Sequence, residues 1–221
     1  SLIEGVENPR SLRKGMTTEP LRVLWITPLR ALASDTVDAL RRPVEDLGLP
    51  WEIALRHGDT SAHQRKKQRN RYPTVLVTTP ESLSLLLTYS DTRTKFRYLD
   101  AVILDEWHEL LGTKRGVQTE LCLARLRTWQ PNLRIWGLSA TLGTLDEAQQ
   151  VLLGSEHEAG VLVGSEESKE IEIETLIPES MECFPWAGHL GARMAPQVAD
   201  RLDLGKTTLV FTNTRSQAEI W

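Results

Sequence analysis

The stretch that decides the fold is Ala101-Val102-Ile103-Leu104-Asp105-Glu106-Trp107-His108. Four apolar residues in a row, too few for a helix, are typical of a strand buried on both faces of a parallel sheet. In such sheets ligands bind beyond the carboxyl ends of the strands, where Asp105 and Glu106 follow. One carboxylate there can hold magnesium through water, and its neighbour can activate a water molecule for phosphoryl transfer. A solvated acidic turn is the plainer interpretation, but the buried strand and His108 favour function.

Short apolar runs alternate with helical patterns on both sides of this stretch. We expect strands at 22–27, 52–55, 74–78, 101–104 and 134–138, with helices at 29–47, 61–71, 81–87, 117–129 and 145–153. Strands that alternate with helices predict an α/β fold, a parallel sheet covered by helices on both faces.

A change in composition predicts two domains. Residues 154–170 are rich in Gly, Ser and Glu, so we expect a linker there, between a first domain at 1–153 and a second at 171–221. In the second we expect strands at 171–177 and 207–212 and helices at 190–202 and from 215 onward.

Composition narrows the class of protein. The chain has 221 residues, of which 40% are hydrophobic, and a net charge of −4, so any nucleic-acid surface must be a local basic patch. The two cysteines have no metal-site or disulfide spacing, which suits a reducing compartment. No apolar run is long enough to span a membrane and no signal pattern opens the chain, so we expect a cytoplasmic protein without membrane contact.

Hydroxyl residues follow several of the predicted strands. Ser139 and Thr141 come after one strand and suit either sensing of a γ-phosphate or a helix N-cap. Thr27-Pro28 and Thr79-Pro80 each close a strand and open a helix, with Thr as N-cap and Pro as first helical residue. Thr212-Asn213-Thr214 is a third such junction. They are good helix starts, and together with Arg30 and Arg215 they offer a grip on a nucleic-acid backbone that reads no bases.

Other charged segments are weaker signals. The basic run at 65–71 is more typical of a solvated helix face than of a phosphate contact. Lys114 and Arg115, in a loop flanked by glycines, suit contact with backbone phosphate. Gly205-Lys206-Thr207 looks like the end of a P-loop, but Asp200 replaces the first glycine and the strand follows rather than precedes it, so we reject that interpretation. For Trp107, packing is favoured over stacking on a base.

The ordered set of motifs resembles the DExH-box helicases of superfamily 2, in particular their large helicase-related (Lhr) group. The motifs, in chain order, are 26–32 (ITPLRAL), 58–60 (GDT), 79–83 (TPESL), 105–109 (DEWHE), 139–141 (SAT) and 210–215 (VFTNTR). Trp107 and the segment 110–116 are similar to the bacterial ligase-associated branch.

This resemblance implies a RecA-like first lobe, the beginning of a second, and ATP with Mg²⁺ as cofactors. It implies Asp105 for magnesium, Glu106 as catalytic base and His108 as the link between the nucleotide site and the second lobe. Ser139 and Thr141 would couple hydrolysis to strand movement. Contacts to single-stranded or partly duplex nucleic acid, DNA in particular, are expected at Pro28, Arg30, Gly58, Asp59, Thr79, Pro80, Lys114, Arg115, Thr212, Thr214 and Arg215.

Two expected parts of such a helicase lie outside the sequence. The family's P-loop is expected before Ser1 and its late motifs beyond Trp221, so we expect a fragment with little ATPase activity of its own. The expected parent is an ATP-dependent DNA helicase or translocase acting in DNA repair, with a ligase as a possible partner. The alternatives are a non-catalytic nucleic-acid-binding module that keeps this scaffold, or a nucleotide-dependent switch without unwinding.

Overall fold

The computed structural model describes residues 19–140, 144–154, 159–164, 172–177, 190–203 and 205–221. The chain forms two compact units, Ser1–Leu162 and Val163–Trp221. Thr141 and Cys183 lie outside the described residues.

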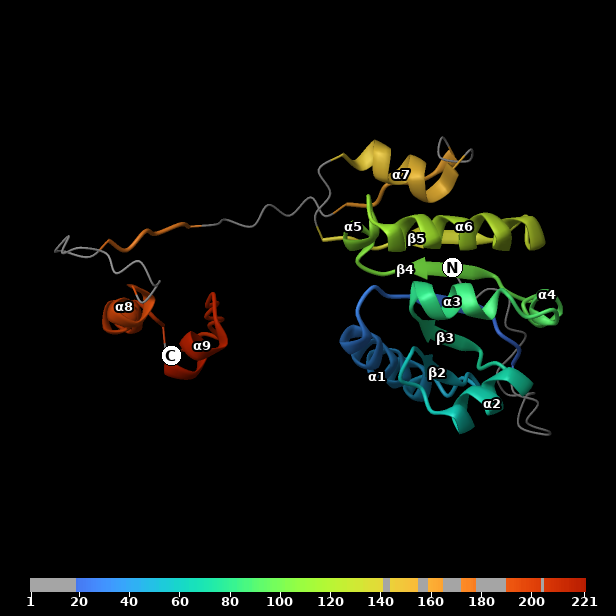
Figure 1. The fold of residues 1–221 in the computed structure, drawn as a ribbon, viewed down its shortest axis with the longest axis horizontal. Helices are drawn as coiled ribbons and strands as arrows, with labels where there is room; N and C mark the ends of the chain where they lie inside the picture. The colour runs from blue at the N-terminus through green and yellow to red at the C-terminus, as the bar shows by residue number, and fades with distance from the viewer. Residues whose placement is uncertain (1–18, 141–143, 155–158, 165–171, 178–189, 204) are drawn as a thin grey trace. The chain divides into compact units, whose positions relative to one another are not determined.

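The first unit is built on a five-stranded sheet in the order β2-β3-β1-β4-β5, parallel throughout (Figure 1). The strands are β1 (Val23–Ile26), β2 (Ile53–Arg56), β3 (Val75–Thr78), β4 (Ala101–Leu104) and β5 (Arg134–Gly137). Ile26, the last residue of β1, pairs with Thr78 and with Leu104, the last residues of its two neighbours. The carboxyl ends of the strands are therefore aligned along one edge of the sheet, as the predicted α/β fold requires.

Seven helices of the first unit are described. They are α1 (Arg30–Asp46), α2 (Ala62–Asn70), α3 (Pro80–Leu86), α4 (Thr92–Lys95), α5 (Trp107–Leu110), α6 (Lys114–Trp129) and α7 (Leu145–Leu153). Helices α3 and α6 lie side by side (Figure 1). Among the described residues, no helix combines the length and the apolar character needed to cross a membrane.

Alternate residues of the strands feed two separate cores. Leu24 and Ile26 of β1 pack in a cluster with residues of α3, α6 and α7. Val23 of the same strand packs in the other cluster, with Ala33 and Val37 of α1. Because successive side chains of a strand point to opposite faces, helices cover the sheet on both sides. This explains why the central strands β1, β3 and β4 have no polar face in the sequence.

The first helix begins later than Thr27-Pro28 predicted. Helix α1 begins at Arg30, and its N-cap is Leu29, which has extended backbone angles. Thr27 instead continues the sheet, because its N–H donates to the Thr78 carbonyl oxygen at 3.0 Å, and its side chain is fully buried. At the second junction the prediction is confirmed: Thr79 is the N-cap of α3 and Pro80 its first residue.

The second unit contains α8 (Leu190–Ala199) and α9 (Arg215–Ile220). The predicted strands at 171–177 and 207–212 are wrong for the residues described, 172–177 and 207–212, which form no ladder. Ile173 is 85% exposed and Phe211 90% exposed. An apolar alternation alone does not make a strand, since a strand also needs a partner for its N–H and C=O groups.

Candidate functional site

The acidic motif is held in a tight turn at the carboxyl end of β4. The Asp105 N–H donates to the Ile26 carbonyl oxygen at 2.8 Å, and the Trp107 N–H donates to that of Leu138 at 2.9 Å. The turn is thereby fixed to the strands on both sides of β4. Between these contacts Glu106 has φ 46° and ψ 48°, the left-handed conformation. This conformation costs a non-glycine residue free energy, and backbone strain of this kind is common at functional sites.

The Asp105 carboxylate keeps capacity to accept further hydrogen bonds. Its Oδ2 accepts from the Trp25 indole N–H at 3.2 Å, and its Oδ1 from the Glu106 N–H at 3.1 Å. Two oxygens offer about four acceptor positions, so water molecules can still bind this half-buried group. No group of three or more His, Cys, Asp or Glu side chains suited to a metal occurs in the described part of the chain. The donor set thus fits a magnesium ion held through water and does not fit an all-protein metal cage.

His108 joins the acidic motif to the segment after β5. Its Nδ1 lies 2.9 Å from the Ser139 hydroxyl and 3.5 Å from the Glu106 carboxylate. Its Nε2 lies 3.5 Å from the Glu109 carboxylate. Two segments separated in the sequence are therefore in direct contact at the edge of the sheet. Thr141, the other hydroxyl predicted here, lies outside the described residues.

Trp107 packs in the core, which confirms the prediction of packing rather than stacking on a base. It is 2% exposed, and its indole N–H donates to the Ala148 carbonyl oxygen of α7 at 3.3 Å. Its burial anchors α5 and leaves no face free to stack on a base.

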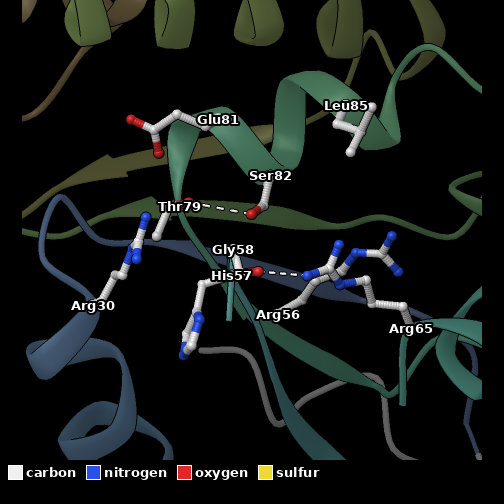
Figure 2. A pocket seen from close by; sticks show the side chains of 9 residues that line it. All are labelled: Arg30, Arg56, His57, Gly58, Arg65, Thr79, Glu81, Ser82 and Leu85. Atoms are coloured by element: carbon white, nitrogen blue, oxygen red, sulfur yellow. Dashed lines mark hydrogen bonds between the residues drawn. The ribbon is translucent and has the colours of Figure 1, made fainter. Parts of the chain in front are cut away.

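A small open pocket of about 190 Å³ lies at the same edge of the sheet, at the ends of β2 and β3 (Figure 2). Three of its side chains are arginines and one is a histidine, and a single carboxylate is present. Its lining residues are Arg30, Arg56, His57, Gly58, Arg65, Thr79, Glu81, Ser82 and Leu85. Thr79 and Ser82 add hydroxyl groups, which lie 3.3 Å apart. The lining suits an anion.

Arg56 is the most unusual member of this pocket. It is the last residue of β2, only 4% exposed, and its Nη1 has no hydrogen-bond partner within the described residues. Burial lowers the pKa of Arg56, while Tyr72 and Tyr89 act in the opposite direction. Arginine remains protonated even so, and a buried cation with an unmatched N–H is costly unless an anion approaches it. Sequence reasoning missed Arg56 because it looks like the end of an ordinary strand.

Two other arginines near the pocket are paired with acids. Arg30 donates to the Asp59 carboxylate at 2.8 Å. Arg115 forms a two-pronged pair with Glu81, at 2.5 and 3.2 Å, and its Nη1 donates to the Pro28 carbonyl oxygen at 2.7 Å. Partial burial would raise the pKa of Glu81, but hydrogen bonds, first that from Arg115, outweigh it and leave the pKa below its ordinary value. Arg115 thus ties α6 to α3 and to the loop after β1.

The other predicted contact residues are spread over both units. Pro80 and Lys114 lie at the first turns of α3 and α6. Thr214 is the N-cap of α9, where its hydroxyl accepts from the Gln217 N–H at 3.2 Å, and Thr212 donates to the Thr214 carbonyl oxygen. Arg215 pairs with Glu219 at 3.1 Å. These three residues belong to the second unit and are described within it.

The sequence of the chain is similar to those of known helicases. The family model for DEAD/DEAH box helicases matches residues 8–150. "ATP-dependent helicase Lhr-Core" of Methanothermobacter thermautotrophicus is 33% identical over 218 residues, which cover 93% of this chain and 25% of the relative. "Lhr helicase/uracil glycosylase" of Escherichia coli is 29% identical, covering 98% of this chain and 15% of the relative. The chain spans a quarter or less of these two relatives.

Solved structures agree on the fold. The Mycobacterium smegmatis helicase Lhr, bound to ssDNA and AMP-PNP, has a TM-score of 0.55 and 39% identity, and covers 63% of this chain and 19% of that one. The helicase MrfA has a TM-score of 0.63 and 22% identity over 90% of this chain and 30% of that one, which supports the RecA-like fold alone. The matched family model extends over more than half of the sequence, and the chain therefore belongs to the DEAD/DEAH box helicase family.

Proposed function

We propose that the protein is an ATP-dependent helicase or translocase that couples ATP hydrolysis to movement on single-stranded DNA. The observation that carries this proposal is the common edge of the sheet: the acidic motif at β4 and the cationic pocket at β2 and β3 lie on either side of β1. Relatives are named as ATP-dependent helicases, and one similar structure is bound to ssDNA and AMP-PNP.

In this proposal each polar group of the acidic motif has a distinct task. Asp105 would hold the water shell of a magnesium ion; ATP would supply the phosphoryl group, and the ion would neutralise its charge. Glu106 orients and deprotonates the attacking water. His108, in contact with the Ser139 hydroxyl at 2.9 Å, relays the state of this site to the segment after β5. We assign Thr141 to the same relay from its motif.

DNA is held, in this proposal, through its phosphates. Thr79 and the first turn of α3 present N–H and hydroxyl groups to the backbone, and the arginine-rich lining supplies charge. The other contacts we propose are Pro28, Arg30, Gly58, Asp59, Pro80, Lys114, Arg115 and, from a second RecA-like lobe that begins at about residue 171, Thr212, Thr214 and Arg215.

The test is the Glu106→Gln variant of the full-length protein. We expect the DNA-stimulated ATPase rate to fall by at least about 100-fold, the usual contribution of a positioned general base, with ssDNA affinity retained. Glu120→Gln, on α6, removes the same charge away from the motif and should leave the rate unchanged. Unchanged turnover in Glu106→Gln would refute the role of Glu106. Binding of ssDNA with no ATPase in any form would favour the non-catalytic binding module.

We further propose a role in DNA repair, in the cytoplasm, beside a ligase. The support is the likeness of Trp107 and residues 110–116 to the ligase-associated branch. Affinity purification of the protein at its native level tests this proposal: recovery of a DNA ligase supports it, and a ligase absent from the purified complex contradicts it.

A further inference from the structure

The basic run of α2 continues from the cationic pocket. Arg65, in the first turns of α2, lines the pocket, donates from Nε to the Thr60 carbonyl oxygen at 2.6 Å, and also donates to the Gly58 carbonyl oxygen (Figure 2). Gln68 is buried and donates to the Leu55 carbonyl oxygen at 2.8 Å. These two contacts fix how α2 is rotated about its axis.

This rotation places the other cations of α2. Residues four apart share one face of a helix, so Arg69 follows Arg65 on the side of the pocket, and Lys66 is next to that face. Lys67 is two residues from Arg65, about 200° around the helix, and so lies on the opposite side. We call Arg65, Lys66 and Arg69 the arginine face. Its length from Arg65 to Arg69 is about 6 Å along the axis.

The arginine face carries charge that the protein does not neutralise. Residues 61–71 contain no acid, and no ion pair of Arg65, Lys66 or Arg69 occurs in the part of the chain that the structure describes. Asp91 is close enough to Arg69 for their charges to interact. The Asp91 carboxylate, however, already pairs with the Lys95 ammonium group at 2.8 Å. The Arg69 guanidinium lies 4.5 Å above the Tyr89 ring, which holds it at the surface. In a chain with a net charge of −4, this concentration of unpaired cations beside an anion pocket calls for an anionic partner.

We propose that the backbone of the bound single strand leaves the pocket along the arginine face of α2. A stacked strand carries a phosphate about every 3.4 Å along its axis, so roughly 6 Å accommodates one or two phosphates beyond the one in the pocket. This inference rests on the proposed function and extends its site to residues that no helicase motif of the chain contains.

The experiment measures the salt dependence of ssDNA binding by the full-length protein, using oligothymidylates of increasing length. Each lost phosphate contact lowers the slope of log K against log salt by about 0.7 on single strands. We expect Lys66→Gln and Arg69→Gln each to lower the slope by about that amount, and Arg69→Lys to restore it. Lys67→Gln removes the same charge from the opposite side of α2 and should leave the slope unchanged.

Oligonucleotide length separates this path from general attraction. Strands that only fill the pocket should bind Lys66→Gln and the unmodified protein alike, and the difference should emerge as the strand lengthens. Equal effects of Lys66→Gln and Lys67→Gln, at every length, would overturn the inference. If the unmodified protein binds no ssDNA, the proposed function itself fails. If it binds and the two faces of α2 are equivalent, only the path along α2 fails.

Discussion

Glu106 combines a strained backbone with the most chemically demanding position of the site. Among the described residues, no other non-glycine residue has a positive φ. Strain of this kind costs about 1–3 kcal/mol, and the surrounding structure must supply it. Here the hydrogen bonds of Asp105 and Trp107 to β1 and to the end of β5 supply it by fixing the turn on both sides.

The strain leads to a prediction about the stability of the fold. Glu106→Gly relieves the left-handed conformation, at an entropic cost of about 0.5–1 kcal/mol, so we expect a net gain of about 1 kcal/mol in the free energy of unfolding. Glu109→Gly, within α5, relieves nothing and should lose about 1 kcal/mol. Urea denaturation of both variants measures this difference. A loss of stability in Glu106→Gly would mean that the turn is not strained.

Cys122 gives a prediction of low reactivity. Burial raises the pKa of the Cys122 thiol to about 11, and a hydrogen bond with Ser84 offsets only part of this. Only the thiolate reacts, so against a thiol of pKa 9 the reactive fraction falls about 100-fold at pH 8. The stability that the protonated thiol contributes is therefore complete below about pH 9 and is lost as the pH rises through 11.

Iodoacetamide labelling of a Cys183→Ser variant checks this prediction. In native buffer at pH 8 we expect labelling of Cys122 at least about 100-fold slower than in urea, because both burial and the raised pKa protect it. Similar rates in the two solvents would show that the α6 face carrying Cys122 is open.

At the scale of elements, the start of α6 packs against the end of α5 so closely that there is no room for a side chain at Gly116. A Cβ atom on Gly116 would lie 2.1 Å from the Leu110 carbonyl oxygen, a backbone atom that no rotamer change can move. Helix propensity alone predicts that Gly116→Ala gains about 1 kcal/mol, whereas the steric overlap costs about 1–3 kcal/mol or more. Because the overlap is with backbone, we expect a cost of about 3 kcal/mol and so a net loss of about 2 kcal/mol, measured as a lower midpoint of thermal unfolding. A more stable Gly116→Ala variant would contradict this packing.

The sequence predicted an element well where the element's own residues form a recognisable apolar pattern. The central strands β1, β3 and β4 are apolar because both faces are buried, and helices such as α1 and α7 are long enough to show a period. Helices α4 and α5 were not predicted, because four residues, as in Thr92–Lys95, are too few for a period. The strands expected in the second unit were wrong for the opposite reason, since a pattern specifies a strand only where a neighbour pairs with it.

The residues of the candidate site likewise form two groups, those that a local sequence motif predicts and those that it does not. The motif that contains Asp105 and Glu106 is local in the sequence and could be predicted. Trp25, which binds Asp105, and Arg56, which lines the pocket, owe their places to the order of the strands, which brings distant segments together. No local pattern distinguishes them from ordinary strand residues.

At the scale of the molecule, the order of strands separates two kinds of chemistry along one edge. The acidic motif follows β4 and contacts the end of β5, while the cationic pocket lies at the ends of β2 and β3, with β1 between them. Arg115 connects the pocket side to the loop after β1 through Glu81 and the Pro28 carbonyl oxygen. Ligands that bind at both places would therefore bias elements that share hydrogen bonds, which is the physical requirement for coupling.

This arrangement predicts reciprocal coupling between nucleotide and DNA in the full-length protein. AMP-PNP should change the affinity for ssDNA by a factor of about 5–150, and ssDNA should change the affinity for AMP-PNP by the same factor. The contact between the His108 ring and the Ser139 hydroxyl is the side-chain contact described between the acidic motif and the segment after β5. Ser139→Ala removes this hydroxyl and should reduce the factor toward one, with each ligand alone bound as before.

Ser90→Ala, at an exposed serine after α3, should leave the factor intact. Fluorescence titrations of each ligand, with and without the other, measure all four affinities. A Ser139→Ala variant that keeps the full factor would show that coupling runs instead through the Arg115 contacts, and Arg115→Gln would then be the variant that abolishes it.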